Sequence, residues 1–343
     1  MPARDAEPPR GAEPRAGAVP ARDVEPAVTR GSGARNAGLV SALALAAVVT
    51  AVGCTAVAAG QGGSHGAGGA AGAGDPASQS AARQARAPAP AVVIVRHVVL
   101  ADGHLMTVAR FSGGVRFVLH CGSADPGSAC PRSLRAGPAV GSAARRWLVA
   151  AFNGGFKLSA GVGGYEQEGR IVSPLVPGRA SLVIYRSGAA SIGVWGHGVP
   201  RPGRRVVSVR QNLGLLVAGG RPTPASASWQ AWGATITGGE FVARSAVGQT
   251  ARGQLIYAAS MSASPADLAA ALVQFGARVG MQLDINPEWV QLAYAHRPGG
   301  HLVKGVIGQV RPADQYVVGW TRDFIAVLAS WLPVTAPGVR VVG

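Results

Sequence analysis

Catalytic motifs that are recognised by their spacing are scarce in this chain. Its 3 cysteines fit neither a Cys-x-x-Cys redox motif nor a zinc knuckle, since eight residues separate Cys121 from Cys130. No Gly-x-Ser-x-Gly nucleophile elbow is present. A histidine-based zinc site is not expected either, because no paired ligand spacing occurs among His120, His197, His296 and His301. The sequence therefore gives no sign of a metal site and identifies no cofactor.

Acidic residues and lysine are also few. The chain has 16 aspartates and glutamates against 32 lysines and arginines, and from residue 91 onward the counts are 10 and 24. This balance favours anionic partners. Only two of the cations are lysine, a bias typical of a GC-rich genome. No basic run interleaved with aromatic residues occurs, so we expect no nucleic acid partner.

The N-terminal part lacks the apolar period of a folded domain. Residues 1–36 are rich in proline, alanine, arginine and glutamate, which predicts a disordered tail. Residues 37–59 contain no charged residue for 23 positions, enough for a helix of about 34 Å that can cross a bilayer. Arg30 and Arg35 precede this span, so the tail is expected in the cytoplasm and the rest of the chain outside.

Three interpretations of the 37–59 span remain open. It is a single-pass transmembrane anchor, a cleaved signal peptide, or a lipoprotein signal with Cys54 as the attachment point. All three export the following chain, which is then tethered to the cell membrane or secreted after cleavage. Residues 60–90 are dominated by glycine, alanine, serine, proline and glutamine, which is typical of a flexible linker.

A folded domain is expected over residues 91–343, and about 250 residues suffice for one sizeable core. In an exported protein, Cys121 and Cys130 favour a structural disulfide over free thiols. Short apolar runs separated by glycine turns predict a mixed β-sheet domain of the α+β class. We expect strands at 92–100, 105–111, 115–120, 147–152, 182–186, 190–195, 205–210, 241–247 and 254–260.

The C-terminal third carries the clearest pattern. Ser264, Pro265 and Asp267 form a helix start, with an N-cap, a proline in the first turn and a capping box. Gly276 suits the end of that helix. A further strand is expected over 278–290, so this part predicts a β-α-β unit with parallel strands.

The segment 278–290 is the strongest sign of a functional site. Alternation along a strand places apolar side chains on one face and Gln282, Asp284 and Asn286 on the other. A charged group in an apolar element is costly unless it is paired or used, so Asp284 is a site candidate. A structural pairing with an arginine is the equal alternative. Ligands bind at the carboxyl edge of parallel strands, where Asp284 is expected.

Two further segments carry candidate residues. Asn153, Gly154 and Gly155 follow an apolar strand, and paired glycines allow the backbone to approach a ligand closely, although such pairs also serve turns. Arg244 is expected inside a strand, where it must meet solvent, pair with an acid or bind an anion. Asp284 is the acid that we expect to pair with it.

The order of these segments is more informative than any one of them. Asn-Gly-Gly-Phe at 153–156 is followed by Leu-Gly-Leu-Leu-Val-Ala-Gly-Gly at 213–220 and Arg-Ser-Ala-Val-Gly at 244–248. A Ser-Pro-Ala-Asp-Leu helix then leads into Leu-Asp at 283–284, and Thr-Arg-Asp-Phe-Ile-Ala ends the series at 321–326. This order resembles the phosphodiester glycosidase family over about residues 145–330.

The resemblance implies a role for several residues. Asn153 and Gly154 match the family's Asn-Gly-Gly-Phe loop, and Arg244 matches the arginine of its Arg-Thr-Ala-Ile-Gly segment. Asp284 matches the aspartate of its Leu-Asp-Gly-Gly-Gly-Ser loop. At 285–288 this chain has Ile-Asn-Pro-Glu instead of three glycines and a serine. Lys157 likewise replaces a phenylalanine, so the chain resembles a divergent branch.

Cleavage of a glycosyl phosphodiester needs a carboxylate near the sugar and cations near the departing phosphate. We expect Asp284 in the first role and Glu288 as a second carboxyl, acting as acid or base. Arg244 and Lys157 are expected to hold the phosphate. Asn153 and Asn286 are expected to bond sugar hydroxyls, and Gly154 and Gly155 are also expected to bind substrate.

The resemblance thus implies an exported, membrane-tethered hydrolase of glycosyl phosphodiesters in envelope or extracellular glycans. The alternative is a non-catalytic module that binds anionic glycan on the same scaffold, which the loss of the triglycine loop favours. Glu166 and Glu168 are weaker candidates for the second carboxyl, because their loop is expected to be a solvated hairpin tip.

Overall fold

The computed structural model describes residues 92–127, 136–330 and 340–342. The described residues belong to one compact unit. The tail, span and linker predicted for residues 1–90 lie outside the described residues. So does Cys130, and its disulfide with the buried Cys121 stays a prediction. Within the described ranges, no helix has the length and apolar character needed to cross a membrane.

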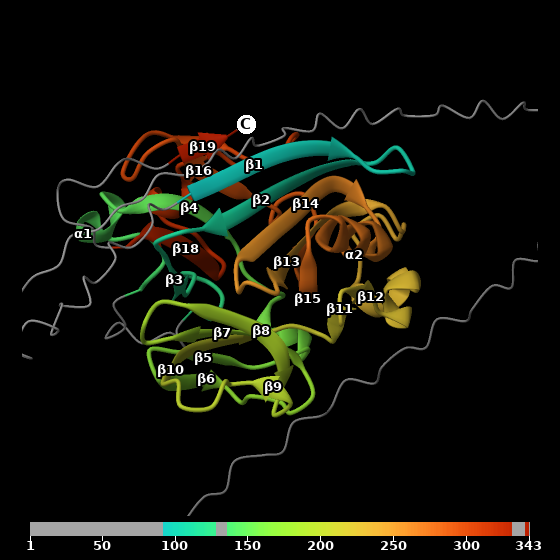
Figure 1. Cartoon of the computed structure of the whole chain (residues 1–343), viewed down its shortest axis with the longest axis horizontal. Helices are drawn as coiled ribbons and strands as arrows, with labels where there is room; N and C mark the ends of the chain where they lie inside the picture. Colours follow the sequence, from blue (N-terminus) through green and yellow to red (C-terminus); the bar gives the residue numbers. More distant parts are fainter. Residues whose placement is uncertain (1–91, 128–135, 331–339, 343) are drawn as a thin grey trace, which may run out of the picture. The chain divides into compact units, whose positions relative to one another are not determined.

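The described residues are mostly β and form three sheets (Figure 1). The largest has eight strands in the order β12-β11-β15-β13-β14-β2-β1-β19. These strands are β1 (Val92–Val99), β2 (Leu105–Ser112), β11 (Leu215–Ala218), β12 (Arg221–Pro222), β13 (Val242–Thr250), β14 (Leu255–Ala263), β15 (Ala277–Ile285) and β19 (Arg340–Val342).

The second sheet has six strands in the order β6-β5-β10-β7-β8-β9. They are β5 (Tyr165–Gln167), β6 (Arg170–Ser173), β7 (Ala180–Tyr185), β8 (Ala190–Trp195), β9 (Gly198–Val199) and β10 (Val206–Gln211). The third sheet has the order β17-β16-β4-β18-β3. Its strands are β3 (Val115–His120), β4 (Leu148–Asn153), β16 (Leu292–Ala295), β17 (Leu302–Lys304) and β18 (Phe324–Ala329).

Helices are few and short. Of the described residues, only those of α2 (Pro265–Gln274) form an α-helix of more than four residues. The remaining helical segments are α1 (Ser142–Arg145), α3 (Gln315–Val318) and the 3-10 turns η3 (Leu158–Ala160), η4 (Pro224–Ala227) and η5 (Trp229–Trp232). The domain is therefore mostly β, with less helix than the predicted α+β class implies. The nine strands expected between residues 92 and 260 are all present, with ends that differ by a few residues.

The predicted β-α-β unit is confirmed, with one strand inserted. β13 lies between β14 and β15 and is antiparallel to both, so β14 and β15 run parallel to each other. α2 connects them and begins with the expected capping box between Ser264 and Asp267. The strand expected over 278–290 ends earlier than predicted. It stops at Ile285 because Asn286 has φ +76°, which is left-handed backbone that a strand does not contain.

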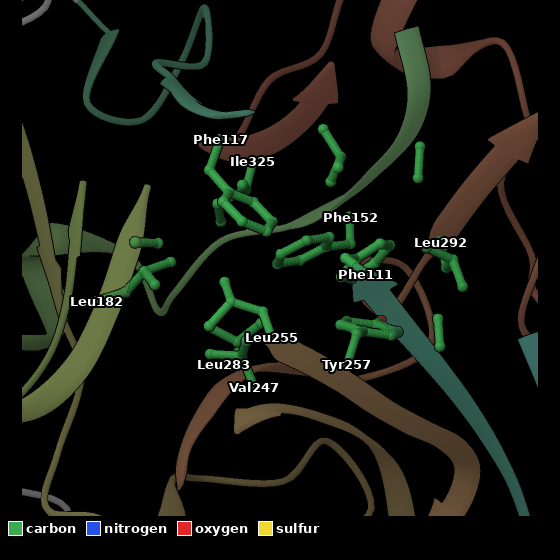
Figure 2. Packing of buried hydrophobic residues seen from close by; sticks show 14 of the residues in the cluster. Phe111, Phe117, Phe152, Leu182, Val247, Leu255, Tyr257, Leu283, Leu292 and Ile325 are labelled. Atoms are coloured by element: carbon green, nitrogen blue, oxygen red, sulfur yellow. The ribbon is translucent and has the colours of Figure 1, made fainter. Parts of the chain in front are cut away.

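The largest core cluster draws on all three sheets (Figure 2). Phe111 of β2 and Phe152 of β4 stack with ring centroids 5.5 Å apart, and Phe117 of β3 contacts Phe111 edge-on at 6.1 Å. Leu182 of β7 and Tyr257 of β14 also belong to the cluster. This shared core holds the ends of β4 and β15 together, and the candidate site forms there.

Candidate functional site

A cavity of about 660 Å³ opens at the carboxyl end of β15. Its wall comes from three loops and one isolated arginine. The loop after β4 contributes Phe156, Lys157, Ser159, Ala160 and Val162, and the loop after η5 contributes Gly233, Ala234 and Ile236. The end of β15 and the following turn supply Asp284, Ile285, Asn286 and Trp289, and Arg322 precedes β18. Residues up to 166 positions apart in the sequence thus meet around one space.

Asp284 is the carboxylate of this cavity and is only 5% exposed. Its Oδ1 accepts a hydrogen bond from the Ile285 N–H at 2.9 Å, and its Oδ2 lies 2.7 Å from Nη2 of Arg322. Burial raises the pKa of Asp284 to about 7, although Arg322 and the Ile285 N–H act in the opposite direction. The group can therefore gain or lose a proton near neutral pH, as a general acid or base must.

Arg322 is the partner of Asp284, and sequence reasoning did not identify it. Its guanidinium is buried, donates from Nη2 to the Gly155 carbonyl at 3.4 Å and lies 4.9 Å from the ring centroid of Trp289. The predicted pairing of Asp284 with Arg244 is therefore wrong. The available signal was the Thr-Arg-Asp segment at 321–323, which ended the family-like series but received no role.

Arg244 is completely buried, but it does not line the cavity. It donates to the carbonyls of Ala263 at 3.1 Å, Trp232 at 3.2 Å and Glu240 at 3.3 Å, and to Oε1 of Gln282 at 3.3 Å. Burial lowers its pKa to about 10, so it remains charged at neutral pH. Arg244 tethers the 232–240 segment, part of which walls the cavity, and its predicted phosphate contact stays a prediction.

Asn153 lies behind the cavity wall, and its side chain connects several strands. Its Nδ2 donates to Oγ of Ser245 at 2.8 Å, and its Oδ1 accepts from the Tyr257 hydroxyl at 2.8 Å and from the Gln291 N–H at 3.3 Å. The side chain thereby joins β4 to β13 and β14. Asn153 is not among the residues that line the cavity, and neither are Gly154 and Gly155.

The paired glycines are required by packing against a second buried ion pair. A Cβ at Gly154 would lie 1.9 Å from Oδ2 of Asp323, and one at Gly155 would lie 2.8 Å from Cζ of Arg210. Arg210 and Asp323 form a bidentate pair, with Nε to Oδ2 at 2.8 Å and Nη2 to Oδ1 at 3.2 Å. The Gly154 carbonyl accepts from the Asp284 N–H at 2.9 Å, so the glycine loop supports the site from behind.

Lys157 and Asn286 line the cavity, and their predicted contacts with substrate stay predictions. Asn286 donates its N–H to Ala243 at 2.8 Å and accepts at Oδ1 from the Ile236 N–H at 3.3 Å. It stands where the family has a glycine, and of residues 285–288 it alone has a positive φ. Asparagine tolerates left-handed backbone better than most residues, so the chain adopts the positive φ at 286 without a glycine.

The carboxyl groups of the other candidates lie elsewhere. Glu288 forms an ion pair with Arg311, both side chains are about two-fifths exposed, and Glu288 is not among the lining residues. Glu168 is in the turn between β5 and β6, which confirms the expected hairpin, and its Oε1 accepts from the Ala136 N–H at 3.0 Å. Burial raises the pKa of Glu166, which also does not line the cavity.

Potential metal ligands converge at one place in the described part of the chain. Nδ1 of His104 lies 3.0 Å from Oδ2 of Asp267 and 3.3 Å from Oδ2 of Asp102. Asp267 is the capping residue of α2, and its Oδ2 also accepts from the Ser264 N–H at 2.8 Å. These hydrogen bonds account for the cluster, none of its members lines the cavity, and we assign no metal to it.

Comparison with solved structures finds distant likenesses of fold. The catalytic domain of zebrafish N-acetylglucosamine-1-phosphodiester alpha-N-acetylglucosaminidase, auto-inhibited by its pro-peptide, matches with a TM-score of 0.46 and 17% identity over 72% of this chain and 85% of that one. A hypothetical protein from Synechocystis matches with a TM-score of 0.41 and 14% identity over 68% and 61% of the two chains.

A putative exported protein from Burkholderia pseudomallei K96243 has a TM-score of 0.36 and 15% identity, over 65% of this chain and 74% of that one. No family model matches the sequence, and the search of curated proteins finds no match. Likenesses at this level do not identify a reaction, so any functional assignment depends on the residues of the cavity.

Proposed function

We propose that the domain of residues 91–343 hydrolyses glycosyl phosphodiesters. One observation carries the proposal: Asp284, whose pKa is about 7, faces a cavity beside the buried cation Arg322. A carboxyl that titrates near neutral pH and a cation for a departing phosphate are the two groups that this reaction requires. Lys157 on the same wall adds a second cation. The family-like order of segments, which includes Leu283-Asp284, supports the same reaction.

In the proposed mechanism Asp284 acts as the general base. Its carboxylate takes a proton from a water molecule while the water oxygen forms a bond to the anomeric carbon of the sugar. The bond between that carbon and the phosphate oxygen breaks, and its electron pair leaves with the phosphate monoester. Arg322 and Lys157 stabilise the charge on the departing group. Asn286 and Trp289 line the same cavity, and in this mechanism their side chains contact the sugar.

The proposal extends to location. Residues 37–59 would anchor the chain in the cell membrane and residues 60–90 would hold the domain outside, where envelope or extracellular glycans provide substrates. Secretion after cleavage is the other outcome of the same export signal. Membrane fractionation with protease protection of intact cells tests this: digestion of the domain without lysis is expected, and protection from protease in intact cells would contradict export.

The experiment for the reaction uses the full chain with a panel of chromogenic glycosyl phosphodiesters. We expect turnover by the parent protein and a loss of about 10²–10⁴-fold in Asp284→Asn, because the variant lacks the general base. Arg322→Ala is expected to lose a similar amount, since the leaving phosphate then lacks its buried cation. Asp314→Asn, which removes one exposed carboxylate outside the cavity, is the matched control and should retain full activity.

The alternative function is a module that binds anionic glycan without cleaving it. One observation favours it: Asp284 is the only carboxylate among the described residues that line the cavity. Glycosidases with two carboxylates at the bond are the common case. Binding of an anionic glycan by the parent, weakened by Arg322→Ala and accompanied by no turnover, would establish the module and reject the hydrolase.

A further inference from the structure

The turn of residues 122–126 is docked against the backbone that carries Arg322. The N–H groups of Ala124 and Asp125 both donate to the Thr321 carbonyl, at 3.0 and 2.9 Å. The N–H of Ser123 donates to the Trp320 carbonyl at 2.9 Å. Three successive N–H groups of one turn therefore fix the two residues that precede Arg322 in the chain.

Gly122 makes this docking close. A Cβ there would lie 2.3 Å from the Thr321 carbonyl oxygen and 2.4 Å from the Arg322 nitrogen. Both neighbours are backbone atoms, which cannot move aside without displacing the segment. The N–H of Gly122 also donates to the Asp125 carbonyl at 3.3 Å, so the turn is closed on itself. No other residue fits at 122 while the turn stays in contact with Arg322.

The side chain of Asp125 joins two walls of the cavity. Its Oδ1 accepts from the Leu158 N–H at 3.3 Å, within the loop that contributes Lys157, Ser159 and Ala160 to the wall. Its Oδ2 lies 3.5 Å from Nε of Arg322, and the side chain is 17% exposed. Both Oδ2 and Nε are buried without a hydrogen bond, so the attraction between them is electrostatic.

We propose that Asp125 is a positioning residue of the candidate active site. From behind, it shares the guanidinium of Arg322 with Asp284, since Nε faces Asp125 while Nη2 meets Asp284. It also fixes the loop that carries Lys157. The turn of residues 122–126 is the rigid element that carries Asp125. The catalytic importance of Asp125 rests on the proposed hydrolase function, but the effect of Asp125 on Arg322 and Asp284 does not.

The carboxylates around Arg322 influence the pH at which Asp284 loses its proton. Asp284 and Asp125 contact its guanidinium directly, and the neighbouring Asp323 is paired with Arg210. Arg322 therefore divides its attraction between two carboxylates. Without the charge of Asp125, the guanidinium is expected to interact with Asp284 alone, which favours the ionised form of Asp284. Asp284 should then lose its proton at a lower pH.

The backbone N–H of Ile285 reports this directly, because it donates to Oδ1 of Asp284. We would follow its amide resonance by NMR in the full chain as a function of pH. The parent should show a midpoint near pH 7. Asp125→Asn is expected to lower that midpoint by about one pH unit, whereas Asp314→Asn, the matched loss of an exposed charge, should leave it unchanged. Equal midpoints in Asp125→Asn and the parent overturn the proposal.

Two further variants separate positioning from a general loss of folding. Asp125→Glu keeps the charge and should restore most of the midpoint. Gly122→Ala keeps Asp125 but displaces the turn and the backbone before Arg322, so Arg322 should move away from Asp284 and the midpoint should rise. A folded Gly122→Ala protein with the midpoint of the parent would contradict the role of the turn, and this readout applies even if Asp125→Asn does not fold.

Kinetic measurements test whether Asp125 also affects the proposed hydrolysis. If the parent hydrolyses a glycosyl phosphodiester, Asp125→Asn is expected to lower kcat/KM about tenfold or more, with its pH optimum moved to lower pH. If the parent shows no turnover, the proposed function fails while the NMR midpoint still decides the positioning role. Unchanged kcat/KM and an unchanged pH profile in an active Asp125→Asn protein would contradict the inference.

Discussion

Two buried ion pairs share adjacent residues of the chain, and they differ in what surrounds them. Asp323 and Arg210 are each only 1% exposed, and the guanidinium makes a bidentate contact while also donating to the carbonyls of Phe156 and Gln211. The Asp284–Arg322 pair has one short contact, an Nε without a hydrogen bond, and a cavity beside it.

The difference separates an enclosed pair from an open pair that borders a cavity. A saturated, enclosed pair gains nothing by exchanging partners, because each lost contact leaves a buried charge unsatisfied. An open pair beside a cavity can accept a new anion and release its own. The burial of a charged residue therefore does not distinguish the two kinds of pair, whereas a cavity beside the pair does.

The largest expected effect is on the enclosed pair. Asp323→Ala leaves Arg210 charged and buried, and we expect it to lower the free energy of unfolding by about 3–5 kcal/mol. Urea unfolding followed by circular dichroism measures this. Arg210→Met combined with Asp323→Leu removes both charges and should cost less than Asp323→Ala alone. A loss below about 1 kcal/mol for Asp323→Ala would contradict a structural role.

The second effect is a pH dependence that belongs to the open pair. The pKa of Asp284 is about 7 in the folded state and near its ordinary value when unfolded, so the native state binds more protons between these values. Stability should therefore fall as pH rises from about 4 to 7, by on the order of 2–4 kcal/mol from this group. Unfolding of the parent and Asp284→Asn at several pH values isolates the contribution, which should be absent from the variant.

The smallest effect tests the capacity of the open pair to bind an anion. At pH 6, where Asp284 is largely protonated, inorganic phosphate at about ten times its dissociation constant should stabilise the parent by about 1 kcal/mol. Arg322→Ala should lose this stabilisation, and chloride at the same ionic strength is the control. Equal stabilisation of the parent and the variant would mean that phosphate binds elsewhere and that the open pair does not accept an anion.

Local patterns in the sequence predicted local structure well. Glycine turns and alternating apolar residues located most of the strands, and the Ser264 to Asp267 capping box located α2. The parallel direction of β14 and β15 followed from the helix between them, and Asp284 does lie at the carboxyl end of its strand. Each of these inferences depends on residues that are close together in the chain.

Side-chain partners across the fold were harder to predict. The strand position of Arg244 was correct, but its guanidinium meets backbone carbonyls that no sequence pattern specifies. Arg322 reaches Asp284 only because β18 pairs with β4, whose end contacts Asp284 through Gly154. Asn153 was predicted to bind a ligand, but its side-chain amide bonds to buried protein groups instead. The sequence does not distinguish these two uses of an amide. Such choices are decided by packing among sheets, and they need the three-dimensional structure.

The core where three sheets meet has a further consequence. β4 and β15 belong to different sheets, yet the Asp284 N–H must reach the Gly154 carbonyl before the cavity wall exists. Contacts between segments so distant in sequence form late and slowly during folding. A chain that has completed only one or two sheets thus lacks the closed cavity. Activity would then report that synthesis and folding are complete, and incomplete intermediates would be chemically silent.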